Sequence, residues 1–272
     1  MRIGYVQYNP SFGEVDRNIK TAVDLIGSVR ADLLVLPELC MTGYLITSRH
    51  EIADLAEEIP GGKTTEALAE LARKRSCFLV AGLAERSGDN LYNSAVLVGP
   101  EGYIGHYRKL HLFFEENLWF TPGDGDLPVF DLGTTRVGIM ICFDWIFPEA
   151  TRTLALKGAQ VVCHPANLVL PFCQDAMKTR CLENRVFAVT ANRTGVEERG
   201  GKSLSYTGMS QITGPEGEII HRCGGEDVKV VVEKIDPVRA ENKAINEYND
   251  LFRDRRPEYY AMLAKKRSNG ND

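Results

Sequence analysis

Short apolar runs alternate along this chain with longer stretches in which apolar residues recur at helical spacing. Leu33-Leu34-Val35-Leu36 is wholly apolar, which is typical of a strand buried on both faces. Ile19, Val23 and Ile26 lie near one stripe of a predicted helix. The pattern predicts strands at 3–8, 33–36, 77–83, 93–98, 103–107, 136–141, 160–163, 187–190, 209–213, 218–221 and 228–235, and helices at 16–30, 64–75, 148–157 and 176–186. This alternation predicts an α/β fold.

Two turn signals divide the pattern into similar halves. Gly99-Pro100-Glu101-Gly102 and Gly214-Pro215-Glu216-Gly217 each separate two predicted strands, so each predicts a hairpin. Both halves run strand–helix–strand and end in such a hairpin, which suggests internal pseudo-symmetry. Two sheets with helices outside each, a four-layer α-β-β-α sandwich, would use all these elements, and a doubly wound single sheet fits nearly as well. No Ser/Gly-rich linker interrupts residues 1–272, which predicts one domain. Residues 236–272 form a polar tail whose arginines and tyrosines are favoured at interfaces, so we expect this tail to help form a dimer.

Composition and charge narrow the classes of protein. The 272 residues are 44% hydrophobic and 25% charged, which is ordinary for a globular domain, and the net charge of −5 argues against a nucleic-acid partner. No apolar run reaches the ~18 residues of a membrane span, and no signal peptide is evident. The seven cysteines are odd in number and widely spaced, so neither disulfides nor a metal site is expected. A cytoplasmic location is the simplest expectation.

Cys142 follows an apolar strand and precedes a helix that opens at Pro148. A turn of this kind lifts a side chain out of a sheet among free backbone N–H groups. A thiol there could attack a carbonyl carbon while the Phe143 N–H holds the developing oxyanion. The alternative is that Cys142 is one more small buried apolar residue.

Glu38 and Lys109 also follow predicted strands. A carboxylate between apolar neighbours at a buried strand end needs a partner or a chemical role, such as that of a general base. An ammonium near a thiol lowers the pKa of the thiol and can stabilise an oxyanion. Each residue alone could equally be a solvated surface charge. Together they supply an acid/base, a cation and a thiol at the carboxyl ends of strands, where α/β folds place their sites.

The motifs L-P-E-L-C-M-T-G-Y around Glu38, Y-R-K-L-H-L-F around Lys109 and G-I-M-I-C-F-D-W-I-F-P-E around Cys142 resemble, in order and context, the Glu-Lys-Cys triad of the nitrilase (carbon–nitrogen hydrolase) superfamily. Glu116 in E-N-L-W-F-T-P-G-D is similar to the additional glutamate near that site. The resemblance covers nearly the whole chain and looks closest to small archaeal and bacterial nitrilase-like amidohydrolases. It implies the four-layer sandwich, a homodimer or larger assembly, and no metal or organic cofactor.

The predicted activity is thiol-dependent hydrolysis of a small non-peptide amide. Alternatives are a nitrilase, an N-carbamoyl hydrolase and a catalytically silent binding subunit; Phe143-Asp144-Trp145 after the cysteine favours amides by resemblance. Predicted pocket residues are Tyr44, Phe114, Trp145 and Asn167. His111 and His164 could form a Cys–His dyad but are expected to be structural. The predicted loops 47–58 and 168–175 do not reveal the substrate.

Overall fold

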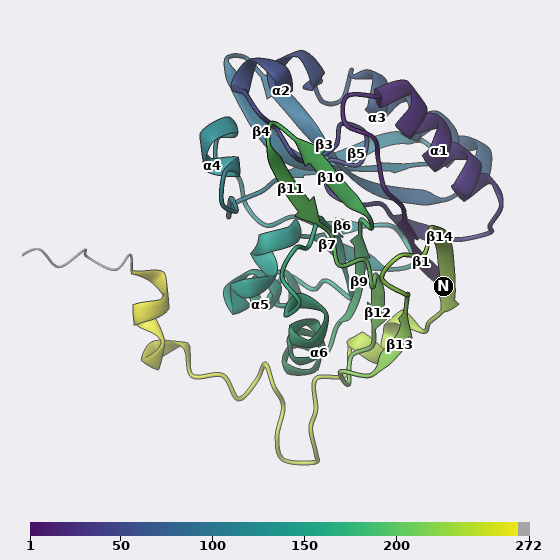
Figure 1. Cartoon of the computed structure of the whole chain (residues 1–272). Helices are drawn as coiled ribbons and strands as arrows, with labels where there is room; N and C mark the ends of the chain where they lie inside the picture. Colours follow the sequence, from purple (N-terminus) through teal and green to yellow (C-terminus); the bar gives the residue numbers. More distant parts are fainter. Residues whose placement is uncertain (266–272) are drawn as a thin grey trace, which may run out of the picture.

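In the computed structural model, which describes residues 1–265, two six-stranded sheets lie face to face (Figure 1). The first has the order β14-β1-β2-β3-β4-β5 and the second β13-β12-β9-β8-β7-β6. The first sheet consists of β1 (Arg2–Gln7), β2 (Leu33–Val35), β3 (Phe78–Ser87), β4 (Asn90–Gly99), β5 (Gly102–Arg108) and β14 (Lys229–Lys234). The second consists of β6 (Val129–Asp131), β7 (Arg136–Ile139), β8 (Val161–Ala166), β9 (Phe187–Asn192), β12 (Gln211–Thr213) and β13 (Ile219–Arg222).

Helices cover the outer face of each sheet (Figure 1). Contacts place α1 (Val15–Gly27) and α3 (Lys63–Arg75) on the first sheet, and α5 (Pro148–Leu156) and α6 (Cys173–Asn184) on the second. Successive side chains of β2 point to opposite faces of the sheet, which explains the layering. Leu33 and Val35 join the core between the sheets, while Leu34 packs toward the helices. The chain therefore forms the predicted four-layer sandwich, and the single doubly wound sheet was wrong.

Within each sheet, the candidate residues follow strands that point in the same direction. β2 pairs in parallel with β3, and the two antiparallel pairings β3–β4 and β4–β5 turn β5 back to the direction of β2. Glu38 follows β2 and Lys109 follows β5, so both lie at one edge of the first sheet. In the second sheet Cys142 follows β7 and Asn167 follows β8, which pair in parallel. Four strand ends thus bring these side chains to one region.

Several elements were not predicted from the sequence. The predicted loop 47–58 contains α2 (Arg49–Leu55), in which the Ser48 side chain caps the N-terminus by accepting from the Glu51 N–H. A separate hairpin, β10 (Val196–Arg199) with β11 (Lys202–Ser205), lies outside both sheets, and α4 (Glu116–Trp119) carries Glu116. The predicted helix 176–186 begins earlier, at Cys173, and ends at Asn184. These elements surround the candidate site.

After β14 the chain leaves the two sheets as a long extended segment with short 3-10 turns (Figure 1). This segment is the described part of the predicted tail, and residues 266–272 of that prediction lie outside the described residues. Among residues 1–265, no helix combines the length and the apolar character needed to cross a bilayer.

Candidate active site

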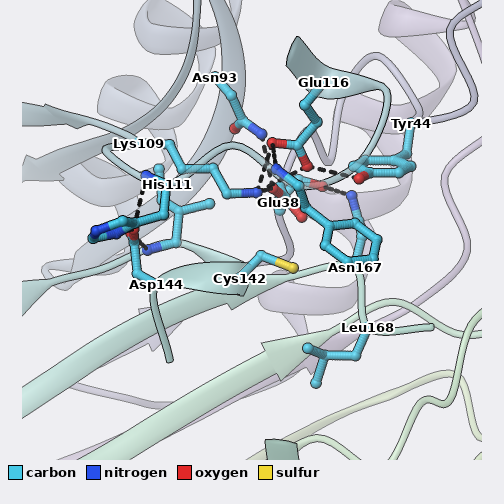
Figure 2. Close-up of polar contacts among 12 residues, drawn as sticks. Glu38, Tyr44, Asn93, Lys109, His111, Glu116, Cys142, Asp144, Asn167 and Leu168 are labelled. Atoms are coloured by element: carbon cyan, nitrogen blue, oxygen red, sulfur yellow. Dashed lines mark hydrogen bonds and ion pairs between the residues drawn. The ribbon is translucent and has the colours of Figure 1, made fainter. Parts of the chain in front are cut away.

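The side chains of Glu38, Lys109 and Cys142 meet between the two sheets (Figure 2). All three residues are buried, with 0%, 1% and 5% of their surface exposed. Lys109 Nζ donates to Glu38 Oε1 at 2.7 Å. The structure thus brings together three residues that are far apart in sequence, as their positions after strands predicted.

Glu116 is the third charged group of this cluster. Lys109 Nζ lies 2.8 Å from each of its carboxylate oxygens, and the Tyr44 hydroxyl donates to Glu116 Oε1 at 2.6 Å. The Phe113 N–H donates to the other oxygen at 3.2 Å. The ammonium of Lys109 therefore lies between two carboxylates, and its position is fixed from both sides.

Glu38 has one paired and one free oxygen. Besides Lys109, the Asn93 side-chain amide donates to Glu38 Oε1 at 2.7 Å. The second oxygen, Oε2, is buried and has no hydrogen-bond partner among the described residues. A buried acceptor without a partner is costly, so a free carboxylate oxygen here points to a proton or ligand that it receives during function. Asn93 lies inside β4, and no local pattern of the sequence indicated this contact.

The charges of the cluster shift several pKa values. Burial lowers the pKa of Lys109, but the charges of Glu116 and Glu38 overcome this and hold it above its ordinary value. Burial raises the pKa of Glu116. Burial also raises the pKa of the Cys142 thiol, the Glu38 charge raises it further, and Lys109 acts in the opposite direction. Lys109 thus lowers the pKa of Cys142 as expected, but burial and the carboxylates outweigh one ammonium, so the net shift is upward.

The turn that carries Cys142 is held by a buried carboxylate. Cys142 has a φ of +40° and begins a 3-10 helix, Cys142–Ile146. Asp144 Oδ2 accepts from the Ile141 N–H at 2.8 Å and from the Tyr107 hydroxyl at 2.9 Å, and its other oxygen lies 2.7 Å from His111 Nδ1. A non-glycine residue at positive φ is strained, and such strain persists where the surroundings fix the backbone, as these bonds do.

His164 holds the same turn from the other side. Its Nε2 lies 2.9 Å from the Cys142 carbonyl oxygen and its Nδ1 lies 3.1 Å from Thr190 Oγ1. Burial lowers the pKa of His164 to about 4, so the ring is neutral at pH 7, and it must carry its proton on Nε2 to donate to a carbonyl. The contact is with the backbone of Cys142 rather than with its thiol. His164 is therefore structural, as expected.

Comparison with known proteins adds an independent result. Residues 2–244 match the family model described as carbon-nitrogen hydrolase. The chain belongs to this family. It is 51% identical over 263 residues to a protein of Pyrococcus abyssi named nitrilase, with 96% of this chain and 99% of that protein covered. It is 35% identical to an (R)-stereoselective amidase of Pseudomonas sp, with 94% and 92% covered.

Solved structures of the carbon–nitrogen hydrolase family share the fold. A carbon-nitrogen hydrolase from Helicobacter pylori G27 is 26% identical and superposes with a TM-score of 0.89, covering 98% of this chain and 99% of the other. An amidase from Nesterenkonia sp. is 25% identical with a TM-score of 0.80, covering 97% and 96%. The predicted superfamily and its four-layer, single-domain fold are confirmed.

In this carbon–nitrogen hydrolase, the predicted pocket residues divide between two neighbouring hollows. Trp145 and Asn167 line a pocket that also contains Cys142 and Phe143. Tyr44 and Phe114 line a second hollow together with Glu116, and Phe114 is 73% exposed. Tyr44 points at Glu116 rather than at the thiol. The side chains that line the pocket at Cys142, those of Phe143, Trp145 and Asn167, are thus better placed to touch a substrate than Phe114.

A buried network that the sequence did not reveal positions Tyr44. Glu197 Oε2, on β10, accepts from the Leu45 N–H at 2.8 Å and from the Tyr206 hydroxyl at 2.9 Å. The same oxygen lies 3.0 Å from the Arg193 guanidinium, and both charged residues are almost fully buried. The β10–β11 hairpin therefore holds the loop whose Tyr44 hydroxyl contacts Glu116. Within residues 1–265, no group of three or more His, Cys, Asp or Glu side chains is arranged to hold a metal ion.

Proposed function

We propose that this carbon–nitrogen hydrolase cleaves small non-peptide amides to a carboxylate and ammonia through a thioester on Cys142. The observation that carries the proposal is the unpaired, buried Oε2 of Glu38 beside a buried thiol and a buried lysine. Because the pKa of Cys142 is raised, the thiol needs a base at the moment of attack, and Glu38 has one oxygen free to serve.

In this mechanism Glu38 Oε2 takes the proton of Cys142 Sγ as sulfur attacks the amide carbon. The ammonium of Lys109 and the Phe143 N–H stabilise the oxyanion of the tetrahedral intermediate. Glu38 then gives its proton to the departing nitrogen, ammonia leaves, and the acyl group remains on sulfur. Water attacks the thioester while Glu38 accepts its proton, and the return of that proton to sulfur releases the acid. Glu116 fixes Lys109 between the two carboxylates.

Two properties of relatives support an amide substrate. The (R)-stereoselective amidase is 35% identical to this chain. A glutamate-to-glutamine variant of the Nesterenkonia amidase shows the result of Michael addition of acrylamide at its active-site cysteine, so in that protein an amide reaches the thiol. The second candidate is nitrile hydrolysis, because the relative at 51% identity is named a nitrilase. N-carbamoyl hydrolysis is a third, since an N-carbamoylputrescine amidase of Solanum lycopersicum is 29% identical. A catalytically silent binding subunit would leave the free oxygen of Glu38 without a role.

The test uses intact-protein mass spectrometry after acid quenching with a panel of small primary amides. The wild-type protein should release ammonia and carry an acyl mass that maps to Cys142. Cys142→Ala should lose turnover by about 10⁴-fold or more and carry no adduct, although the small void leaves the fold intact. The matched control is Cys181→Ala, since Cys181 is also fully buried but lies in α6. Turnover by Cys142→Ala would identify a different nucleophile and overturn the proposal.

The choice between amide and nitrile needs paired substrates that share one acyl group. Attack on an amide gives an oxyanion at once, whereas attack on a nitrile places nitrogen at that position. We expect a larger kcat/KM for amides in each pair. Faster turnover of several nitriles would make the chain a nitrilase while leaving the triad in place.

We also propose a homodimer and a cytoplasmic location. The tail beyond β14 carries exposed apolar side chains away from the sheets, which supports a partner subunit as their cover. A thiol nucleophile must stay reduced to act, which supports a reducing compartment.

A further inference from the structure

The surroundings of Cys142 differ sharply between its two sides. In Figure 2 the polar side chains of Glu38, Lys109 and Glu116 lie on one side of the thiol, and Leu168 lies on the other. Among residues 1–265, the pocket over the thiol is lined by carbon-rich side chains together with Cys142 and Asn167. The apolar and aromatic members are Phe113, Phe143, Trp145, Leu168, Val169 and Leu170. The reacting bond thus meets polar groups on one side and an apolar wall on the other.

The charged side chains near this pocket are already paired with one another. Lys109 is bound by Glu38 and Glu116, as described above. In the neighbouring hollow Lys202 Nζ lies 2.5 Å from Glu115 Oε1. No ionisable side chain other than the Cys142 thiol lines the apolar pocket in the described part of the chain. A charged group entering it would lose its hydration and find no counter-charge.

The polar atoms of Asn167 suit the carboxamide group of a substrate rather than the acyl chain attached to it. Asn167 Nδ2 donates to the backbone oxygen of Glu38 at 2.8 Å, which fixes the orientation of the side chain. Its Oδ1 is buried and has no partner among the described residues, so it is free to accept an N–H from a bound carboxamide. If the carboxamide oxygen faces Lys109, the remaining part of the substrate must extend toward the apolar wall.

We propose that the pocket formed by Phe113, Phe143, Trp145 and residues 168–170 binds an uncharged, apolar acyl chain. The enzyme would then act on primary amides of simple neutral carboxylic acids, and not on amides that carry a second charged group. This inference rests on the proposed amide hydrolysis and specifies its substrate class. The structural reason is that desolvation of an ion in this pocket is not compensated by any facing charge.

The first experiment compares kcat/KM for isosteric pairs at pH 7.5, with ammonia release as the readout. Pentanamide is paired with cationic 4-aminobutanamide, and 4-methylpentanamide with anionic succinamate. We expect the neutral member of each pair to be preferred by about 100-fold or more. Comparable rates within either pair would overturn the inference and leave the proposed amidase function standing. Absence of turnover and of acyl adduct with every amide would instead overturn the proposed function, and the inference with it.

The second experiment places a charge on the apolar wall. Leu170→Arg should raise the ratio of kcat/KM for succinamate to that for 4-methylpentanamide by about 10-fold or more, because the anion gains a partner. Leu156→Arg is the matched control, since Leu156 is a leucine of the same 42% exposure at the end of α5, outside the pocket. An unchanged ratio in Leu170→Arg, with a normal unfolding temperature, would show that the acyl chain does not lie against this wall. A shift of the same size in the control would also contradict the assignment.

Discussion

The buried ammonium of Lys109 does not by itself set the protonation of Cys142, because two carboxylates surround it. Two carboxylates contact its ammonium, so the cluster already holds more negative than positive charge when both are ionised. A thiolate on Cys142 would add another negative charge to a buried site, where little water is present to disperse it. The raised pKa of Cys142 follows from this. In the proposed mechanism the thiolate is therefore formed only as substrate binds, with the free oxygen of Glu38 as the base.

His164 leads to a prediction on stability against pH. The pKa of His164 is lowered from 6.5 to about 4 by burial, so between these values the unfolded chain binds a proton that the folded protein excludes. Stability must therefore fall as the pH drops from about 6.5 to about 4. At 1.36 kcal/mol for each pKa unit, the loss from this group is on the order of 3 kcal/mol.

Urea unfolding at pH 7 and pH 4 measures this loss. His164→Gln retains a donor for the Cys142 carbonyl but does not titrate, so its free energy of unfolding should fall by about 3 kcal/mol less than that of the wild type. His50→Gln is the control, because the His50 side chain is 87% exposed, and it should behave as the wild type. Equal losses in all three proteins would show that His164 is not the group responsible.

At the level of single residues, the sequence predicted those that follow strands. Glu38 and Cys142 come directly after apolar runs, which makes a polar side chain conspicuous, and Lys109 follows a predicted strand. Asn93 lies within a strand, and its contact with Glu38 joins residues 55 apart. Glu197 lies in a polar segment and is paired with residues from three other parts of the chain. Such partners are set by long-range packing, which a local pattern does not contain.

Among the elements, those with a strong apolar period were predicted and those without one were missed. The segment 196–205 is mostly polar because the β10–β11 hairpin packs on neither sheet as a core strand. α2 has seven residues and only Ile52 is buried, so its apolar stripe is too short to detect. β10 nevertheless shapes the site, since it fixes the Tyr44 loop through Glu197. An element that positions side chains of the site need not contribute apolar residues to the core, so the apolar pattern of the sequence does not reveal it.

The approach of β3 to the loop after β2 depends on a glycine. A Cβ added at Gly82 would lie 2.5 Å from the Cα of Glu38 and 2.7 Å from the Leu39 nitrogen. Both are backbone atoms, so relief requires the loop that carries Glu38 to move. Gly82→Ala should therefore lower kcat by at least about 10-fold, through displacement of the general base, and destabilise the fold by about 1–3 kcal/mol.

Steady-state kinetics and chemical denaturation test this expectation together. Gly61→Ala is the matched control, since an added Cβ at Gly61 meets no atom within 4 Å. The control should keep wild-type kcat and stability. A Gly82→Ala enzyme with unchanged kcat would mean that Glu38 keeps its place despite the contact, and the close approach would then have no role in catalysis.

For the whole molecule, the two-sheet architecture could be suggested but not decided from sequence. The order of strands and helices fits a single sheet as well as two, because the choice depends on which strands pair across long separations. β1 pairs with β14, so Arg2 lies beside Lys234. A strand that is distant in sequence thus forms one edge of the first sheet. The site between the sheets exists only in the two-sheet arrangement, where Glu38 and Lys109 come from one sheet and Cys142 from the other.

The segment after β14 leads to the prediction on assembly. Tyr248, Tyr259, Met262 and Leu263 are 77%, 71%, 73% and 67% exposed, and Figure 1 shows this part of the chain away from the two sheets. Exposed apolar side chains on an extended segment are unfavourable in water unless a partner covers them, and aromatic residues and methionine are enriched at interfaces. We therefore expect a dimer in which each tail contacts the other subunit.

Light scattering at micromolar concentration should give twice the protomer mass for the wild-type protein. The double substitution Met262→Glu and Leu263→Glu should shift the mass toward the protomer, because two carboxylates would be buried without partners at the interface. Val228→Glu, at a position 55% exposed just before β14, should remain dimeric. A wild-type monomer would refute the dimer itself. A double variant that stayed dimeric would place the interface elsewhere, on a surface of the sandwich rather than on the tail, and the exposed side chains of residues 248–263 would then need another partner.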